Sequence, residues 1–128
     1  MNLNQVTVPA RDIATSVAFY QTLGLQQIVL DTHYARFQCP AGGATFSVEL
    51  SAGILPAQSA AVIYFEITNL DERIKQLQAA GIVFTQEPSD QSWLWREARL
   101  LDPAGNRICL YRAGENRLNP PWRIPTAN

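Results

Sequence analysis

Two stretches of this chain follow the same pattern at a spacing of 57 residues, and this repeat constrains the fold more than any other feature. Each stretch predicts a helix with one apolar stripe, which follows a short strand and ends at a glycine. The paired positions are Ile13 with Leu70, Val17 with Ile74, and Gly24 with Gly81. A repeat of this kind predicts that the chain folds as two copies of one module.

The residues around both helices alternate between apolar and polar, as half-buried strands do. The predicted helices span 12–23, with Asp12 as N-cap, and 69–80, where Asn69 and Glu72 resemble a capping box. The predicted strands are 3–8, 26–31, 34–39 and 44–50 in the first half, and 61–67, 82–86, 96–102 and 107–112 in the second. Each half is therefore a βαβββ module, and the fold class is α+β.

We expect a single domain over 1–128, with module 1 at about 1–52, module 2 at about 60–112 and an irregular tail at 113–128. The segment 51–60 between the modules is rich in small residues and contains Pro56. Because each helix buries its stripe against the apolar face of the strands, the helices lie on the outer face. The opposite faces are too polar for a second core and predict a curved, cup-shaped mixed sheet that holds a ligand.

Composition and charge exclude several classes of protein. Hydrophobic residues make up 47% of the chain and charged residues 16%, which is typical of neither a disordered nor a membrane-spanning protein. The net charge of −1, without a basic run, argues against nucleic acid as a partner. The two cysteines, Cys39 and Cys109, imply no disulfide framework, and no signal-peptide pattern begins the chain. We therefore expect a cytoplasmic protein.

The segments FYQTLGL, LDERIKQLQAAGI and DPAGNRICL occur in this order within the doubled βαβββ pattern. Together they resemble the vicinal oxygen chelate superfamily, which includes glyoxalase I, extradiol dioxygenases and bleomycin resistance proteins, and the resemblance covers about 3–112. It implies a homodimer. Members that use a metal place His, Gln or Glu ligands on the first and last strands of each module, positions that correspond here to Gln5, Glu49, Val62 and Cys109.

Only part of that ligand set is present in this chain. Val62 has no lone pair to offer, and the thiol of Cys109 is a soft ligand for the hard metals that such sites often hold. The sole histidine, His33, is predicted to lie in an exposed turn, away from these positions. The resemblance therefore implies a degenerate metal site, and we predict no cofactor.

The candidate ligand-binding residues are Gln5, Glu49, Tyr64, Trp95, Arg99 and Cys109. Glu49 is also the candidate catalytic residue, as a general base, with a satisfied polar wall residue as the alternative. Gln5 would hydrogen-bond a ligand carbonyl or fill the floor beside Glu49. Cys109 would be a nucleophile only if a neighbour lowered its pKa, and a small buried residue is the preferred interpretation.

Aromatic residues in two places add to the predicted site. Trp93 and Trp95 are two residues apart and could sandwich a planar ligand or cation, although a subunit interface or core packing is the preferred interpretation. If Trp95 faces the cup, Glu97 and Arg99 face it too. The proline-rich tail around Trp122 is predicted to dock over the cup or a partner chain.

The leading hypothesis is a small-molecule-binding protein of the glyoxalase/bleomycin-resistance type that holds an apolar or aromatic ligand in its cup. The alternative is a divergent metal-dependent lyase or isomerase, in which Gln5 and Glu49 hold the metal and Glu49 assists proton transfer. A third hypothesis is a partner-binding module whose cup is filled by its own side chains. The sequence leaves open whether the protein is an enzyme.

Overall fold

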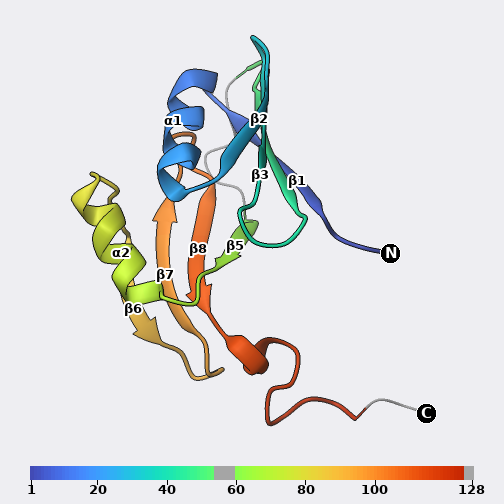
Figure 1. Ribbon diagram of the computed structural model, residues 1–128, viewed down its shortest axis with the longest axis vertical. Coiled ribbons are helices and arrows are strands. Elements are labelled where there is room, and N and C mark those ends of the chain that lie inside the picture. The colour runs from blue at the N-terminus through green and yellow to red at the C-terminus, as the bar shows by residue number, and fades with distance from the viewer. Residues whose placement is uncertain (54–59, 126–128) are drawn as a thin grey trace. The chain divides into compact units, whose positions relative to one another are not determined.

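The computed structural model describes residues 1–53 and 60–125, so most of the segment 51–60, including Pro56, lies outside the described residues. In chain order (Figure 1) the elements are β1 (Gln5–Ala10), α1 (Ile13–Leu23), β2 (Gln26–Leu30), β3 (Tyr34–Gln38), β4 (Thr45–Leu50), β5 (Val62–Glu66), α2 (Leu70–Ala79), β6 (Gln86–Asp90), β7 (Arg96–Leu101), β8 (Arg107–Arg112) and a short 3-10 helix (Gly114–Arg117). The strands form two four-stranded sheets, in the orders β1-β4-β3-β2 and β5-β8-β7-β6. The α+β class and the two βαβββ modules are confirmed.

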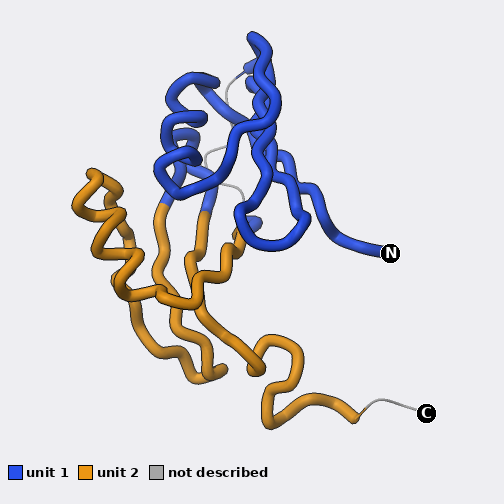
Figure 2. Tube along the Cα trace, viewed as in Figure 1, with its two compact units in different colours: residues 1–61, 101–107 blue, residues 62–100, 108–128 orange. Residues whose placement is uncertain are grey.

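The chain divides into two compact units (Figure 2). Unit 1 consists of residues 1–61 and 101–107, and unit 2 consists of residues 62–100 and 108–128. Unit 1 therefore contains the whole first module together with the turn between β7 and β8. Unit 2 contains α2, the rest of the second sheet and the tail.

In unit 1, α1 covers one face of its sheet through aromatic contacts. Tyr20 is fully buried, and its ring lies 4.6 Å from that of Phe46 and 5.8 Å from that of Phe37, measured between centroids. The predicted N-cap is confirmed, because the carboxylate of Asp12 accepts a hydrogen bond of 2.8 Å from the backbone N–H of Thr15. At the other end, Gly24 has φ of 105°, a conformation that costs a side-chain-bearing residue energy.

The turn at 101–107 is held in unit 1 by a buried aspartate. One carboxylate oxygen of Asp102 accepts the backbone N–H groups of Ala104 and Asn106. The other oxygen accepts the hydroxyl of Tyr20 at 2.6 Å and the side-chain amide of Asn106 at 2.7 Å. Because the side-chain amide of Asn106 also donates to the carbonyl of Pro9, the turn contacts both α1 and β1 through satisfied polar groups.

Unit 2 repeats the helix pattern with a different start. The predicted stripe of α2 is confirmed, since Leu70, Ile74 and Leu77 are at most 1% exposed. Gly81 has φ of 96°, matching Gly24 in the first module. The predicted capping box is wrong: the side chain of Asn69 makes no capping hydrogen bond, because its φ and ψ of −100° and 54° depart from the extended backbone of Asp12.

One predicted strand is displaced, whereas the others agree with the observed ones to within two residues at each end. We expected a strand over 82–86, but β6 spans Gln86–Asp90 and shares only its first residue with that range. β6 is one of the two outer strands of its sheet, and its pairing with β7 is irregular between Gln86 and Ser89, around Pro88. An outer strand tolerates the missing N–H of proline, which is why a sequence that contains proline still forms this strand.

Removing the Asp102 carboxylate should destabilise the protein strongly. We expect Asp102→Ala to lower the free energy of unfolding by about 3 kcal/mol, because it leaves several buried donors without an acceptor. Tyr20→Phe deletes one hydrogen bond and should lower the free energy of unfolding by about 1 kcal/mol. Denaturant unfolding followed by circular dichroism measures both, with the exposed Glu72→Ala as the control. An Asp102→Ala protein as stable as the control would contradict the prediction.

Candidate functional site

The face of the first sheet that lies opposite α1 carries a hydrogen-bonded row of polar side chains. Alternation along β4 buries Phe46 and Val48 on the helix side and places Ser47 and Glu49 on this open face. Gln5 of β1 lies on the same face, and its side-chain amide donates to the hydroxyl of Ser47 at 2.8 Å. The side-chain oxygen of Gln5 accepts the hydroxyl of Thr45. Both the nitrogen and the oxygen of the Gln5 amide are therefore hydrogen-bonded to side chains of β4.

Two members of this polar row were missed in the sequence. The hydroxyl of Tyr34 lies 2.6 Å from that of Ser47, and the Nε of Arg36 donates to the Tyr34 hydroxyl at 2.8 Å. The hydrogen bond with Ser47 is the main influence that lowers the pKa of Tyr34, and the Arg36 guanidinium contributes in the same direction. The signal was present, since Tyr34, Arg36 and Gln38 alternate with the apolar residues of β3.

Glu49, the predicted catalytic residue, is exposed on this face and pairs in register with Tyr34 of β3 and Pro9 of β1. Within the described residues it makes no hydrogen bond or ion pair. Gln5 and Glu49 thus share one face of the sheet, but no hydrogen bond joins them. Both side chains are exposed, but only that of Gln5 is hydrogen-bonded to its neighbours.

Three aromatic side chains of unit 2, Tyr64, Trp95 and Tyr111, form a second feature, which we term the aromatic cluster. The rings of Trp95 and Tyr111 stack with centroids 4.8 Å apart. Tyr64 meets both rings edge-on, with centroids 5.9 Å from Trp95 and 5.4 Å from Tyr111. Tyr111 is buried, Trp95 is partly buried, and Tyr64 is 41% exposed, so the cluster presents an aromatic edge to the surface.

A charged pair lies against the aromatic cluster. The guanidinium of Arg99 lies 5.9 Å from the centroid of the Tyr64 ring, and it donates to the Tyr64 hydroxyl at 3.2 Å. It also forms an ion pair of 2.9 Å with Glu97, whose side chain is only 1% exposed. The indole N–H of Trp93 donates to the other oxygen of Glu97 at 2.8 Å. Glu97 is thus a buried, fully paired anchor that orients Arg99.

Cys109 is buried and packs against the aromatic cluster. The residue is 0% exposed and packs with Tyr111, Ala113, Val62 and Trp95. Burial raises the pKa of its thiol to about 12, and the negative charge of Glu97 adds to this shift. A thiol in this state is protonated at neutral pH, which agrees with the interpretation of Cys109 as a small buried residue.

The structure therefore gathers the predicted residues in two groups. Tyr64, Trp95 and Arg99 contact one another in unit 2, with Cys109 beneath them, whereas Gln5 and Glu49 share the open face of the first sheet. His33 lies in the exposed turn between β2 and β3, as predicted.

Comparison with known proteins identifies the family. The family model for the glyoxalase/bleomycin resistance protein/dioxygenase superfamily matches residues 2–110. The chain belongs to this superfamily. The resemblance seen in the sequence is thereby confirmed, although no curated protein sequence matches the chain. None of the helices in the described part of this superfamily member is long and apolar enough to cross a membrane.

Solved structures show the same fold. A bleomycin-binding protein complexed with bleomycin is 24% identical, with a TM-score of 0.71, covering 88% of this chain and 98% of that one. A glyoxalase/bleomycin resistance protein/dioxygenase from Nocardioides is 20% identical, with a TM-score of 0.77, covering 98% and 90%. A lactoylglutathione lyase from Agrobacterium tumefaciens is 17% identical, with a TM-score of 0.73, covering 92% and 96%.

The thiol of Cys109 should resist alkylation in the native protein. In a Cys39→Ser variant at mildly alkaline pH, we expect iodoacetamide to modify Cys109 at least about 100-fold more slowly than in the unfolded chain, because the thiol is buried and protonated. Mass spectrometry measures both rates. The converse variant, Cys109→Ser, keeps the partly buried Cys39. In the native state, iodoacetamide should modify this Cys39 faster than it modifies Cys109 in the Cys39→Ser variant. Equal native and unfolded rates for Cys109 would show that it is accessible.

Proposed function

We propose that this superfamily member binds a small organic molecule with a planar aromatic or apolar part. The observation that carries the proposal is the aromatic cluster with Arg99 beside it. Tyr64 is 41% exposed, and Arg99 is held by Glu97, so the aromatic edge and the cation are oriented before any ligand arrives. Such a surface suits a planar ring that stacks on the cluster while a polar or anionic substituent meets Arg99.

Gln5 and Glu49 belong to the first sheet and are proposed for that surface by itself. Glu49 is an exposed carboxylate that would accept a hydroxyl or cationic group bound on the open face of the first sheet. Gln5 would act through the polar row of that sheet, since its amide already bonds to Ser47. Cys109 would hold the aromatic cluster in place by packing against Trp95 and Tyr111. We further propose that the protein is cytoplasmic and, on the family resemblance, that it forms a homodimer in which the tail around Trp122 docks on a partner.

The donor chemistry favours binding without a metal. Of the four positions that correspond to metal ligands in the superfamily, Val62 has no donor atom, and Cys109 has a buried, protonated thiol. Gln5 offers a neutral amide oxygen that already accepts one hydrogen bond, and Glu49 is the one carboxylate among the four positions. Within the described residues, no three His, Cys, Asp or Glu side chains gather closely enough to hold an ion. These residues do not fit a divalent metal, so we derive no metal-dependent step.

Titration with 2-naphthoate, a planar aromatic anion, tests the proposal by isothermal titration calorimetry. Trp95→Leu removes a stacking surface and should weaken binding about tenfold, since aromatic contacts of this size contribute about 1 kcal/mol or more. Arg99→Gln should weaken 2-naphthoate binding more than that of the uncharged 2-naphthylmethanol. The control is Val83→Ala, which removes an exposed apolar side chain that is not part of the aromatic cluster.

Added EDTA should leave the affinity for 2-naphthoate unchanged. Wild-type-like binding by Trp95→Leu would contradict the role of the aromatic cluster. A loss of binding with EDTA that one divalent ion per chain restores would contradict the metal-free proposal.

A further inference from the structure

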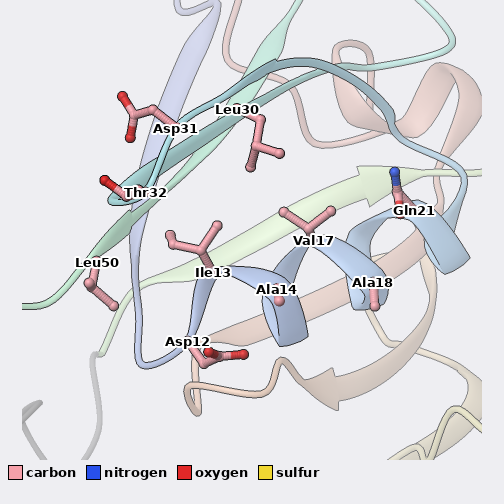
Figure 3. A pocket seen from close by; sticks show the side chains of 10 residues that line it. All are labelled: Asp12, Ile13, Ala14, Val17, Ala18, Gln21, Leu30, Asp31, Thr32 and Leu50. Atoms are coloured by element: carbon pink, nitrogen blue, oxygen red, sulfur yellow. The ribbon is translucent and has the colours of Figure 1, made fainter.

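A pocket of about 490 Å³ lies in unit 1, between α1 and the end of the β2–β3 hairpin (Figure 3). Its volume is within the range of small-molecule sites. Figure 3 shows Ile13 and Val17 of α1 directed toward Leu30 of β2 across this space. Leu30 is 64% exposed, so a large apolar side chain stands open at the pocket wall. The ten lining residues are Asp12, Ile13, Ala14, Val17, Ala18, Gln21, Leu30, Asp31, Thr32 and Leu50.

This pocket lies on the other side of the first sheet from Gln5 and Glu49. Leu50 alternates with Glu49 along β4, and it therefore points to the helix side together with Phe46 and Val48. Leu30 pairs in register with Ala35, which is fully buried on that same side. The pocket is thus separate from the surface of the proposed function and is formed by unit 1 alone.

The charged side chains that line the pocket are all negative. Two carboxylates, Asp12 and Asp31, line the pocket, and no Lys, Arg or His is among its ten residues. Hydrogen bonds from Thr15 lower the pKa of Asp12, which keeps it ionised. The helix N-terminus offsets about half an elementary charge, so two carboxylates leave the pocket negative.

Both carboxylates are positioned by the backbone and keep one oxygen available. One oxygen of Asp12 accepts the N–H and hydroxyl of Thr15, and one oxygen of Asp31 accepts the N–H of His33 at 2.8 Å. The second oxygen of each has no hydrogen-bond partner among the described residues. A ligand ammonium group would supply the donors and the charge that these oxygens lack.

We propose that this pocket binds an amphiphilic organic cation, with its alkyl or ring portion against Ile13, Val17 and Leu30 and its ammonium group at Asp12 and Asp31. The apolar wall gives the affinity, and the two carboxylates discriminate against anions of the same shape.

Octylammonium and octanoate, two probes of equal chain length and opposite charge, test this proposal in the whole protein. Titrations followed by amide NMR shifts should move the signals of residues 12–21 and 30–32 with octylammonium, and octanoate should bind at least about fivefold more weakly. Asp31→Asn keeps the acceptor for the His33 N–H but loses the charge, and it should weaken octylammonium binding several-fold. Val17→Phe narrows the pocket and should weaken both probes.

The control Glu72→Gln removes an exposed carboxylate of α2 and should leave binding unchanged. Equal affinities for the two probes, or an Asp31→Asn protein that binds octylammonium normally, would overturn the proposal. Shifts confined to Tyr64, Trp95 and Arg99 would place the probe at the aromatic cluster and also overturn it. So would a dimer in analytical ultracentrifugation that Leu30→Glu abolishes, because a second copy would then cover the pocket.

Discussion

The carboxylate of Asp102 is the interaction on which unit 1 depends. It is 5% exposed, and four donors from Tyr20, Ala104 and Asn106 surround it. A buried carboxylate is tolerated only when its oxygens are hydrogen-bonded, and this one is satisfied by the turn that it begins and by the helix against which that turn lies. The hydroxyl of Tyr20 can reach it only because the ring of Tyr20 lies on Phe46, within the apolar layer of α1 and the first sheet. The polar anchor and the apolar core thus hold each other in place.

That packing decides which chemistry each sheet presents. Once Phe46 and Val48 face α1, strand alternation places Ser47 and Glu49 on the opposite face, where Gln5 and Tyr34 join them through hydrogen bonds. In unit 2 the same alternation brings Tyr64, Tyr111 and Arg99 together. One face of unit 1 is a network of polar groups, and the cluster in unit 2 is aromatic with a charged partner. The two modules therefore have the same scaffold and different surfaces.

The repeat is preserved where the backbone needs it and broken where side chains meet the surface. Gly24 and Gly81 both adopt positive φ, and Tyr20 and Leu77 are both buried. By contrast, Asp12 caps its helix and Asn69 does not, and the exposed Glu49 corresponds to the buried Cys109. The glycines after the helices and the buried helix positions obey local geometry, which the repeated sequence reproduces in both modules. The helix N-caps and the Glu49 and Cys109 positions differ between the modules.

The sequence by itself determined the two βαβββ modules, the α1 cap at Asp12, the buried stripe of α2 and the superfamily, because these follow from periodicity and turn chemistry over short spans. The predicted stripe of α1 is buried only at Ile13 and Tyr20, whereas Val17 and Leu23 stay partly exposed. The sequence did not place β6 correctly, because the proline in this segment argues against a strand. The strand forms because β6 lies at the edge of its sheet, where the missing N–H of proline is tolerated. Tertiary structure also decided that Glu97 is buried, that Tyr34 and Arg36 join Gln5 through Ser47, and that α1 and β2 line an open pocket. These features depend on which strands become neighbours. A strand's own alternation assigns a side chain to a face, whereas only pairing across the sheet determines what that side chain meets there.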